Sequence, residues 1–157
     1  MLSLFFRNLF FTILQPGLVA GLFPYLILGK SFQKPFAQPF QLPQYLGAIL
    51  FIFGLVIMLN CIIRFAIEGR GTLSPVDPTK KLVVKGLYKF SRNPMYIGVM
   101  IILVGEIIFF SSYNLGVYTL FILLAFSLFI ILIEEPRLRR DFGNDYHEYC
   151  KRVRRWL

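Results

Sequence analysis

The sequence contains few of the residues that commonly bind metals or crosslink a small protein. Among its 157 residues there are one histidine and two cysteines. Cys61 lies in an apolar stretch and Cys150 in a polar tail, so the two are not expected to form a disulfide. A disulfide-stabilised scaffold and a zinc site built from clustered cysteine and histidine are therefore excluded, and we expect no bound metal.

Acidic residues are also scarce, and the chain carries a formal net charge of +9. In a soluble protein, such a balance would suggest nucleic acid as the partner. However, 57% of the residues are hydrophobic, and phenylalanine alone occurs 18 times. A soluble domain of this length could not bury that much apolar surface. We therefore predict an integral membrane protein with no nucleic-acid partner.

Four apolar runs divide the chain, which has no internal repeat or low-complexity segment. They cover approximately residues 4–28, 45–67, 95–110 and 115–133. Because roughly 20 helical residues cross a bilayer core, the third run is short and must be flanked by interfacial residues or packed within protein. The brief link at residues 111–114 predicts an antiparallel hairpin of the last two helices.

The first run and the segment after it carry further expectations. Pro16 predicts a kink within the first run. This run is too long for a signal peptide, and no clear small-residue cleavage site follows it, so we expect no removable leader. The Gln- and Pro-rich residues 33–44 are expected to form a loop.

Lysine and arginine are concentrated in two parts of the chain. Fourteen of the 17 basic residues lie around the second loop or in the tail, whereas the third loop has none. With four spans, both basic segments lie on one side of the membrane, and the positive-inside rule makes that side cytoplasmic. We therefore expect both termini in the cytoplasm, where the basic residues can also contact anionic lipid headgroups.

The polar tail has a helical pattern. Its apolar residues recur at spacings of three and four with charges between them: Leu138, Phe142, Tyr146, Tyr149 and Val153. This pattern predicts an amphipathic helix. Such a helix can lie at the membrane interface, cover a cytoplasmic site, or do both.

The stretch SRNPMYIG, residues 91–98, joins the basic second loop to the third apolar run. Asn93 is a favoured helix cap and Pro94 a favoured first helical residue, so the third span should begin here. Its first N–H groups would attract an anionic group, with Arg92 beside them. Glu134 and Glu135, at the end of the fourth run, should lie at the same membrane face.

These residues permit two interpretations. In the first, they form a capped helix end, with an ion pair between Arg92 and one of the two glutamates. In the second, they bind a zwitterion, whose carboxylate lies at the helix start and whose ammonium group lies at the glutamates. The residue types alone leave both interpretations open.

Two segments carry a family resemblance: LVVKGLYKFSRNPMYIG at residues 82–98 and EEPRLRRDFGNDYHEYCKRVRRW at residues 134–156. They resemble the isoprenylcysteine carboxyl methyltransferase and phospholipid methyltransferase group of membrane enzymes, in which such segments occur in this order and are separated by two apolar runs. The resemblance extends from the second loop to the C-terminus. It implies a methyltransferase that uses S-adenosylmethionine and a lipophilic acceptor, which is isoprenylcysteine-like, a phospholipid or another small hydrophobic molecule.

Ten positions are the candidate cofactor-binding residues: Lys81, Leu82, Val83, Tyr88, Arg92, Asn93, Pro94, Met95, Tyr96 and Glu134. The resemblance implies that the first three lie along the cofactor and that the tyrosine at position 88 packs on it or bonds to it. Residues 93–96 would form the turn that holds its amino-acid end. Glu134 would bind its ammonium group or its ribose hydroxyls, and Gly86 and Gly98 would permit close approach. No catalytic residue is assigned.

Three further positions bear on the chemistry. Many relatives have histidine where this chain has Asn93, so we expect no general base there. Enzymes that methylate the isoprenylcysteine carboxylate have an arginine where this chain has Ile130, which leaves a different lipophilic acceptor open. Glu106 is the one acid well inside an apolar run. We expect it to pair with Arg64, and the alternatives are that it stays protonated or, least favoured, serves a substrate amine.

Together these observations predict an all-α, polytopic membrane protein with about four transmembrane helices, a cytoplasmic loop and a C-terminal amphipathic helix. We expect a single integral membrane domain over residues 1–157, with two spans in residues 1–67 and the cofactor-binding loop, helical hairpin and tail in residues 68–157. Membrane lipids are expected partners. The alternative functions are a membrane reductase that uses a nicotinamide cofactor, since sterol reductases resemble this group in their C-terminal half, and a non-catalytic membrane scaffold.

Overall fold

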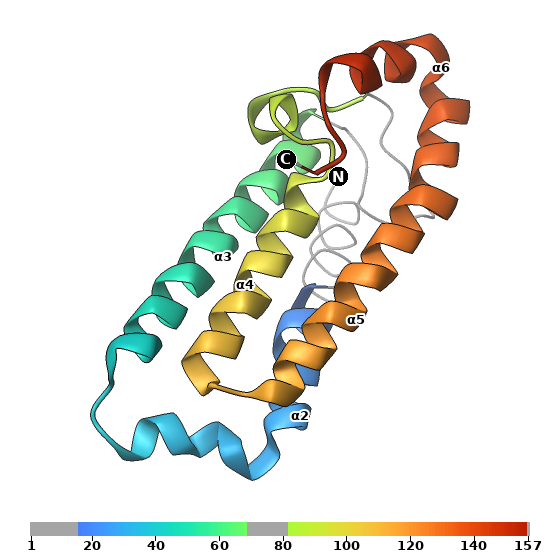
Figure 1. The fold of residues 1–157 in the computed structure, drawn as a ribbon. Helices are drawn as coiled ribbons and strands as arrows, with labels where there is room; N and C mark the ends of the chain where they lie inside the picture. Colours follow the sequence, from blue (N-terminus) through green and yellow to red (C-terminus); the bar gives the residue numbers. More distant parts are fainter. Residues whose placement is uncertain (1–15, 69–81, 157) are drawn as a thin grey trace, which may run out of the picture.

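The computed structural model describes residues 16–68 and 82–156, which fold into helices (Figure 1). The first part contains a π-helical turn, η1 (Leu18–Leu22), followed by α2 (Phe23–Leu28), a 3₁₀ helix, η2 (Gly29–Ala37), and α3 (Leu42–Glu68). The second part contains η3 (Gly86–Lys89), α4 (Pro94–Phe110), α5 (Tyr113–Phe129), the π-helical turn η4 (Ile130–Glu134) and α6 (Glu135–Arg152). Within these residues every regular element is helical, which confirms the all-α prediction.

Helices α3 and α4 are antiparallel and pack closely at glycines (Figure 1). A Cβ added at Gly47 would lie 2.7 Å from the carbonyl oxygen of Gly105, and one added at Gly54 would lie 2.6 Å from that of Gly98. Glycines two turns apart on both helices therefore let the two backbones approach more closely than larger residues permit. This contact places the start of α4 beside the C-terminal half of α3.

Helices α4 and α5 form the expected hairpin. Ser111 follows α4 with a left-handed φ of 48°, and the hydroxyl oxygen of Ser112 accepts a hydrogen bond from the Leu115 N–H at 3.4 Å. The turn thus reverses the chain and caps the start of α5. The brief link between the two apolar runs is confirmed as a tight helical connection.

Helix α5 continues through η4 into α6 as one long helical path, which bends at Gly143 (Figure 1). Gly143 has a φ of 49°, a conformation that side chains disfavour. After the bend, α6 returns over the end of the bundle and the chain leaves it at Val153. The N–H of Arg92 donates to the carbonyl of Arg154 at 2.9 Å, so the C-terminal segment lies beside the start of α4.

The described N-terminal helix is broken at Ala20, where φ is −109° and ψ is 18°. Pro24 accounts for this break, because a proline ring clashes with the carbonyl four residues earlier. Pro24 also has no N–H, and the nearby Val19 carbonyl instead accepts a 2.8 Å hydrogen bond from the Tyr118 hydroxyl of α5. The described residues therefore contain a break at Ala20, whereas the turn before Pro16, where a kink caused by Pro16 would lie, is outside the described residues.

The Gln- and Pro-rich segment is not wholly a loop, contrary to expectation. Helix η2 extends to Ala37 and α3 begins at Leu42, so only residues 38–41 lie outside helices. The rings of Phe32 and Phe36 lie 5.3 and 5.7 Å from the rings of Phe110 and Phe109, centroid to centroid. This aromatic packing against the end of α4 stabilises a helix that the polar and proline residues alone do not predict.

The described helices have the apolar character of a membrane protein. Leu42–Arg64 of α3 and the helical path Tyr113–Arg152 are long and apolar enough to cross a membrane, and α4 is shorter. Large apolar side chains are exposed along both: among them Ile49, Phe53, Val56, Phe121, Leu124 and Leu128. Such an exterior suits lipid better than water. The count of four spans stays a prediction.

Candidate functional site

A buried carboxylate lies where α6 begins. Glu135 is 4% exposed and accepts two hydrogen bonds from the Arg155 guanidinium, at 2.8 and 3.0 Å. It also forms ion pairs with Arg92 at 3.1 Å and with Arg139 at 3.7 Å. Hydrogen bonding to Glu135 raises the pKa of Arg155 above its ordinary value. Three guanidinium groups therefore surround this one carboxylate, and we call this set the Glu135 cluster.

Arg92 is held mainly by residues of α6. Its Nη1 lies 2.8 Å from the Cys150 sulfur and 3.4 Å from the Tyr146 hydroxyl oxygen, in addition to the ion pair with Glu135. Of the two interpretations that the sequence left open, the structure therefore contains the ion pair, and Glu135 rather than Glu134 is the partner. A contact between Arg92 and a cofactor stays a prediction.

Asn93 occupies the capping position of α4, but its side chain does not cap the helix. Its Nδ2 instead donates to the Arg155 carbonyl at 2.9 Å, and Ser91 Oγ donates to the same carbonyl at 3.2 Å. The expected capping role is therefore wrong, because the amide anchors the C-terminal segment. Helix α4 begins with Pro94, and no side chain of the described residues caps the N–H groups of its first turn.

Glu134 has different surroundings from Glu135. Its Oε2 accepts a 2.8 Å hydrogen bond from the Tyr96 hydroxyl, which comes from the first turn of α4. The Tyr96 ring is held in place by Phe126 of α5, with 4.8 Å between the ring centroids. Among the described residues, no hydrogen-bond donor reaches Glu134 Oε1. One acid of the pair is thus saturated by arginines, while the other keeps an available oxygen.

The predicted residues of the second loop fall into two groups. Val83 and Tyr88 are buried against Cys61 of α3, and Met95 packs on the same cluster. Burial raises the pKa of Tyr88 well above its usual range, so this phenol stays neutral. The Tyr88 carbonyl accepts a 2.6 Å hydrogen bond from the Tyr149 hydroxyl, which ties the loop to α6.

Leu82 belongs to the second group, on the other side of the loop. It packs with the apolar residues of the tail: Leu138, Phe142, Tyr146, Tyr149 and Val153. These five residues therefore contact protein, although α6 is bent at Gly143. Their position at a membrane interface stays a prediction. Lys81 lies outside the described residues.

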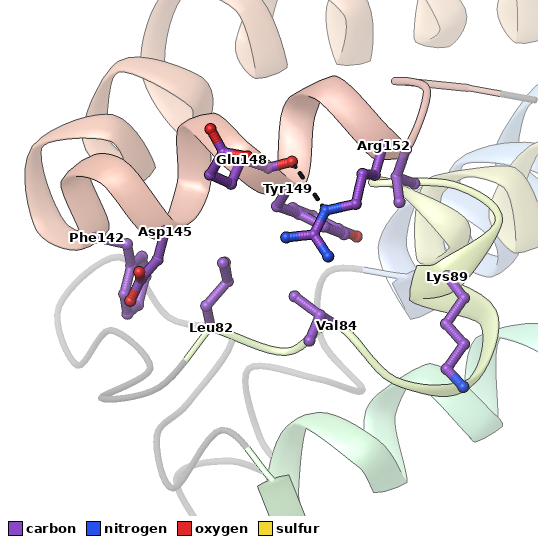
Figure 2. A pocket seen from close by; sticks show the side chains of 9 residues that line it. Leu82, Val84, Lys89, Phe142, Asp145, Glu148, Tyr149 and Arg152 are labelled. Atoms are coloured by element: carbon purple, nitrogen blue, oxygen red, sulfur yellow. Dashed lines mark hydrogen bonds between the residues drawn. The ribbon is translucent and has the colours of Figure 1, made fainter.

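A cavity of ≈ 820 Å³ lies between this loop and α6 (Figure 2). Its apolar wall includes Leu82 and Val84, and its polar residues are Lys89, Asp145, Glu148 and Arg152. Figure 2 shows Arg152 pointing toward the loop residues, with its Nε donating to the Glu148 carbonyl at 3.4 Å.

Of the candidate cofactor-binding residues that the structure describes, which are all but Lys81, Leu82 alone lines this cavity. The cavity's charged residues were not predicted from the sequence, because they belong to the polar faces of the tail helix and contact a loop that is distant in sequence. The one signal that could have indicated this cavity is the opposite charge of the basic second loop and the acids of the tail.

The two glycines expected near the cofactor are both required by packing within the protein. Gly86 has a φ of 61°, and a side chain there would collide with the Arg64 guanidinium. Gly98 faces Gly54 of α3, so it permits the two helices to pack closely. Close approach of a cofactor is therefore not needed to account for either glycine.

Glu106 does not pair with Arg64, contrary to expectation. Arg64 Nε donates to Asn60 Oδ1 at 3.2 Å, at the end of α3 that lies beside the start of α4. Glu106 lies twelve residues after Pro94 in α4, or about 18 Å along a helix that rises 1.5 Å per residue. The two groups are therefore at opposite ends of the bundle.

Known proteins resemble this chain over most of its described length. The family model described as phospholipid methyltransferase matches residues 42–145. Two curated proteins named probable protein-S-isoprenylcysteine O-methyltransferase, from Oryza sativa subsp. indica and subsp. japonica, are each 28% identical to it over 131 residues. Each match covers 80% of this chain and 66% of the rice protein, slightly less than two thirds of its length. No solved structure matches the chain significantly.

The family match contains the start of α4, the Tyr96–Glu134 pair and Glu135. It runs from the first residue of α3 into α6, well over half of the chain. The chain therefore belongs to the phospholipid methyltransferase family.

Proposed function

We propose that this protein is a membrane methyltransferase that moves a methyl group from S-adenosylmethionine to a lipophilic acceptor. Family membership supports the reaction class. The family's description names a phospholipid, and the names of the rice proteins refer to isoprenylcysteine, so both point to acceptors with long apolar chains. The observation that carries the proposal is the pairing of Glu134 with Tyr96 at the uncapped start of α4.

This arrangement suits the amino-acid end of S-adenosylmethionine. The N–H groups of the first turn of α4 have no side-chain cap, and they favour a carboxylate. Glu134 Oε1 can accept a hydrogen bond from an ammonium group. Because Tyr96 of that first turn donates a hydrogen bond to Glu134, the N–H groups that favour a carboxylate and the oxygen that can bind an ammonium group lie close together. Glu135 has no such capacity, since arginines surround it.

The residues of the site would mainly bind and orient. When bound, S-adenosylmethionine supplies a methyl group on a sulfonium, whose sulfur takes back the bonding electron pair as a neutral thioether while the acceptor's lone pair forms the new bond. Glu134 and the start of α4 would fix the donor's position, and the apolar helices would exclude water from the reacting atoms. A carboxylate acceptor needs no base, whereas an ammonium acceptor must first lose a proton, and Asn93 cannot accept one.

We further propose that the acceptor enters from the bilayer and the donor from the cytoplasm. Helices α4 and α5 present almost only apolar side chains, which suit an acyl or prenyl chain and could not satisfy a polar acceptor. Ile130 is buried and apolar where enzymes that methylate the isoprenylcysteine carboxylate have arginine, so acceptors other than a free carboxylate are also compatible. The proposed topology has four spans with both termini cytoplasmic, in a single domain.

Calorimetric titration of the purified protein tests the donor. S-adenosylmethionine and S-adenosylhomocysteine should both bind, and the reduced nicotinamide dinucleotide phosphate should not. Binding of the nicotinamide cofactor alone would identify a reductase, and binding of none of the three would favour a scaffold.

Methyl transfer tests the acceptor. With methyl-labelled S-adenosylmethionine and native membranes, the label should partition into the organic phase, and Glu134→Gln should abolish this transfer. Label that is found only on a water-soluble product would contradict entry from the bilayer.

A further inference from the structure

A second cavity lies at the opposite end of the bundle from the start of α4. Its volume is ≈ 490 Å³, which is in the range of small-molecule sites. Residues of α2, η2, α3 and α4 form most of its wall, and Figure 1 shows α2 and η2 (blue to cyan) at this end. The lining contains several aromatic rings, among them Tyr25, Phe32, Phe51 and Phe109.

The cavity opens at the outer surface of the protein. Tyr25, Phe36 and Ile52 line it, yet they are 53%, 55% and 60% exposed. Their outer faces continue the apolar exterior of α3, which suits lipid. A molecule dissolved in the bilayer could therefore reach the cavity without passing through water.

Glu106 is the one acidic residue among the described residues that line this cavity. It is 8% exposed, and its Oε2 is buried without a hydrogen-bond partner among the described residues. A buried carboxyl oxygen without a partner is unfavourable and rare in native proteins. No described lysine, arginine or histidine lines the cavity. The Tyr118 hydroxyl of α5 is committed to the Val19 carbonyl.

We propose that this cavity binds a lipophilic amine, whose ammonium group donates a hydrogen bond to Glu106 and whose hydrocarbon body lies among the aromatic rings. A bound cation offsets the charge of a buried carboxylate, whereas a neutral alcohol does not. Aromatic faces also attract a cation when water is excluded. A free phosphate or carboxylate finds no cationic partner in the described lining.

The amine site is separate from the proposed methyl-donor site. Glu106 lies about 18 Å along α4 from Pro94, by the helical rise. An amine at Glu106 therefore does not reach the first turn of α4 or Glu134 with its polar group. Binding of an amine at Glu106 therefore does not depend on the methyltransferase reaction.

Saturable binding of labelled dodecylamine and dodecanol to the full-length protein tests the proposal. The protein is placed in phosphatidylcholine nanodiscs, and empty nanodiscs are measured in parallel to correct for partitioning into lipid. Dodecylamine should bind to one site, at least about tenfold more tightly than dodecanol. Glu106→Gln, which keeps the shape of the side chain, should weaken dodecylamine binding about tenfold or more and leave dodecanol unchanged. Asp141→Asn is the matched loss of an acid elsewhere and should change neither affinity.

A second variant and a mapping experiment make the test independent of charge. Ala48 lines the cavity, so Ala48→Phe should fill it and abolish binding of both probes. If this variant fails to fold, a photoactivatable dodecylamine should still label cavity residues such as Phe51 and Phe109 in the wild-type protein. Equal affinity for the two probes with no effect of Glu106→Gln, labelling elsewhere, or the absence of saturable binding would each overturn the proposal.

Discussion

The two adjacent glutamates should respond to the same substitution in opposite ways. Glu134→Gln should weaken binding of S-adenosylmethionine and barely change stability. The hydrogen bond from the Tyr96 hydroxyl can persist, because a glutamine side-chain oxygen also accepts a hydrogen bond. The lost charge-assisted hydrogen bond to an ammonium group is worth about 1.5–3 kcal/mol, or roughly tenfold or more in affinity.

Glu135→Gln should instead destabilise the fold. Arg92 is 12% exposed and would lose its buried anionic partner, whereas Arg155 and Arg139 are 35% and 67% exposed and can be solvated. Breaking a buried ion pair by removing one partner costs about 3–5 kcal/mol, and we expect the lower end because glutamine keeps one acceptor oxygen. The start of α4, the end of α6 and the C-terminal segment meet at this cluster, so all three should loosen together.

Two measurements on purified protein separate these effects. Thermal unfolding followed by circular dichroism should show a lower midpoint for Glu135→Gln than for Glu134→Gln. Calorimetric titration, well below both midpoints, should show the larger loss of affinity for Glu134→Gln. Equal small effects of both variants in both measurements would mean that neither glutamate has a distinct part in binding or stability, and the assignment of different roles would be wrong.

Three further predictions concern neighbouring features. Tyr96→Phe removes the hydroxyl that orients Glu134. Loss of this hydrogen bond, worth about 1 kcal/mol, should weaken S-adenosylmethionine binding about fivefold and leave the unfolding midpoint unchanged, whereas an unchanged dissociation constant would show that Tyr96 is not part of the site. Gly54→Ala places a methyl group 2.6 Å from the Gly98 carbonyl oxygen and should destabilise the protein by about 1–3 kcal/mol. Gly116→Ala, whose added methyl group has no neighbouring atom within 4 Å, should not destabilise it, and equal unfolding midpoints of the two variants would refute the close packing of α3 and α4. A reporter that is active only outside the cytoplasm, fused after Leu157, should be silent, and strong activity there would refute the four-span topology.

Local sequence signals predicted the helices of this protein well. The change from a polar loop to an apolar run at Pro94 marked the first residue of α4, and the short polar link after Phe110 marked the hairpin. These signals succeed because helix starts and turns depend on a few consecutive residues. The polar segment that forms η2 was predicted as a loop, because the contacts of its phenylalanines with α4 are between residues distant in sequence.

The candidate site could be predicted in outline only. Arg92 and the two glutamates were predicted to be neighbours. Which glutamate pairs with Arg92 depends on the C-terminal segment, which returns to α4 through the bend at Gly143. Likewise, Asn93 is a good cap by residue type, but the Arg155 carbonyl competes for its amide. The sequence contains both partners of each contact and does not specify which of the several possible pairs form.

The different surroundings of Glu134 and Glu135 follow from their adjacent positions on one helical path, where η4 passes into α6. Successive residues of an α-helix point about 100° apart, so adjacent side chains cannot face the same neighbour. Glu134 is the last residue of the π-helical turn η4 and points to Tyr96 of α4, whereas Glu135 is the first residue of α6 and points to Arg92 and Arg155. Glu135 takes the hydrogen bonds and ion pairs of Arg92, Arg139 and Arg155, whereas Glu134 accepts one hydrogen bond, from Tyr96, and keeps an oxygen that can accept another. A π-helical turn at this position is therefore consistent with the frequent occurrence of such turns at functional sites.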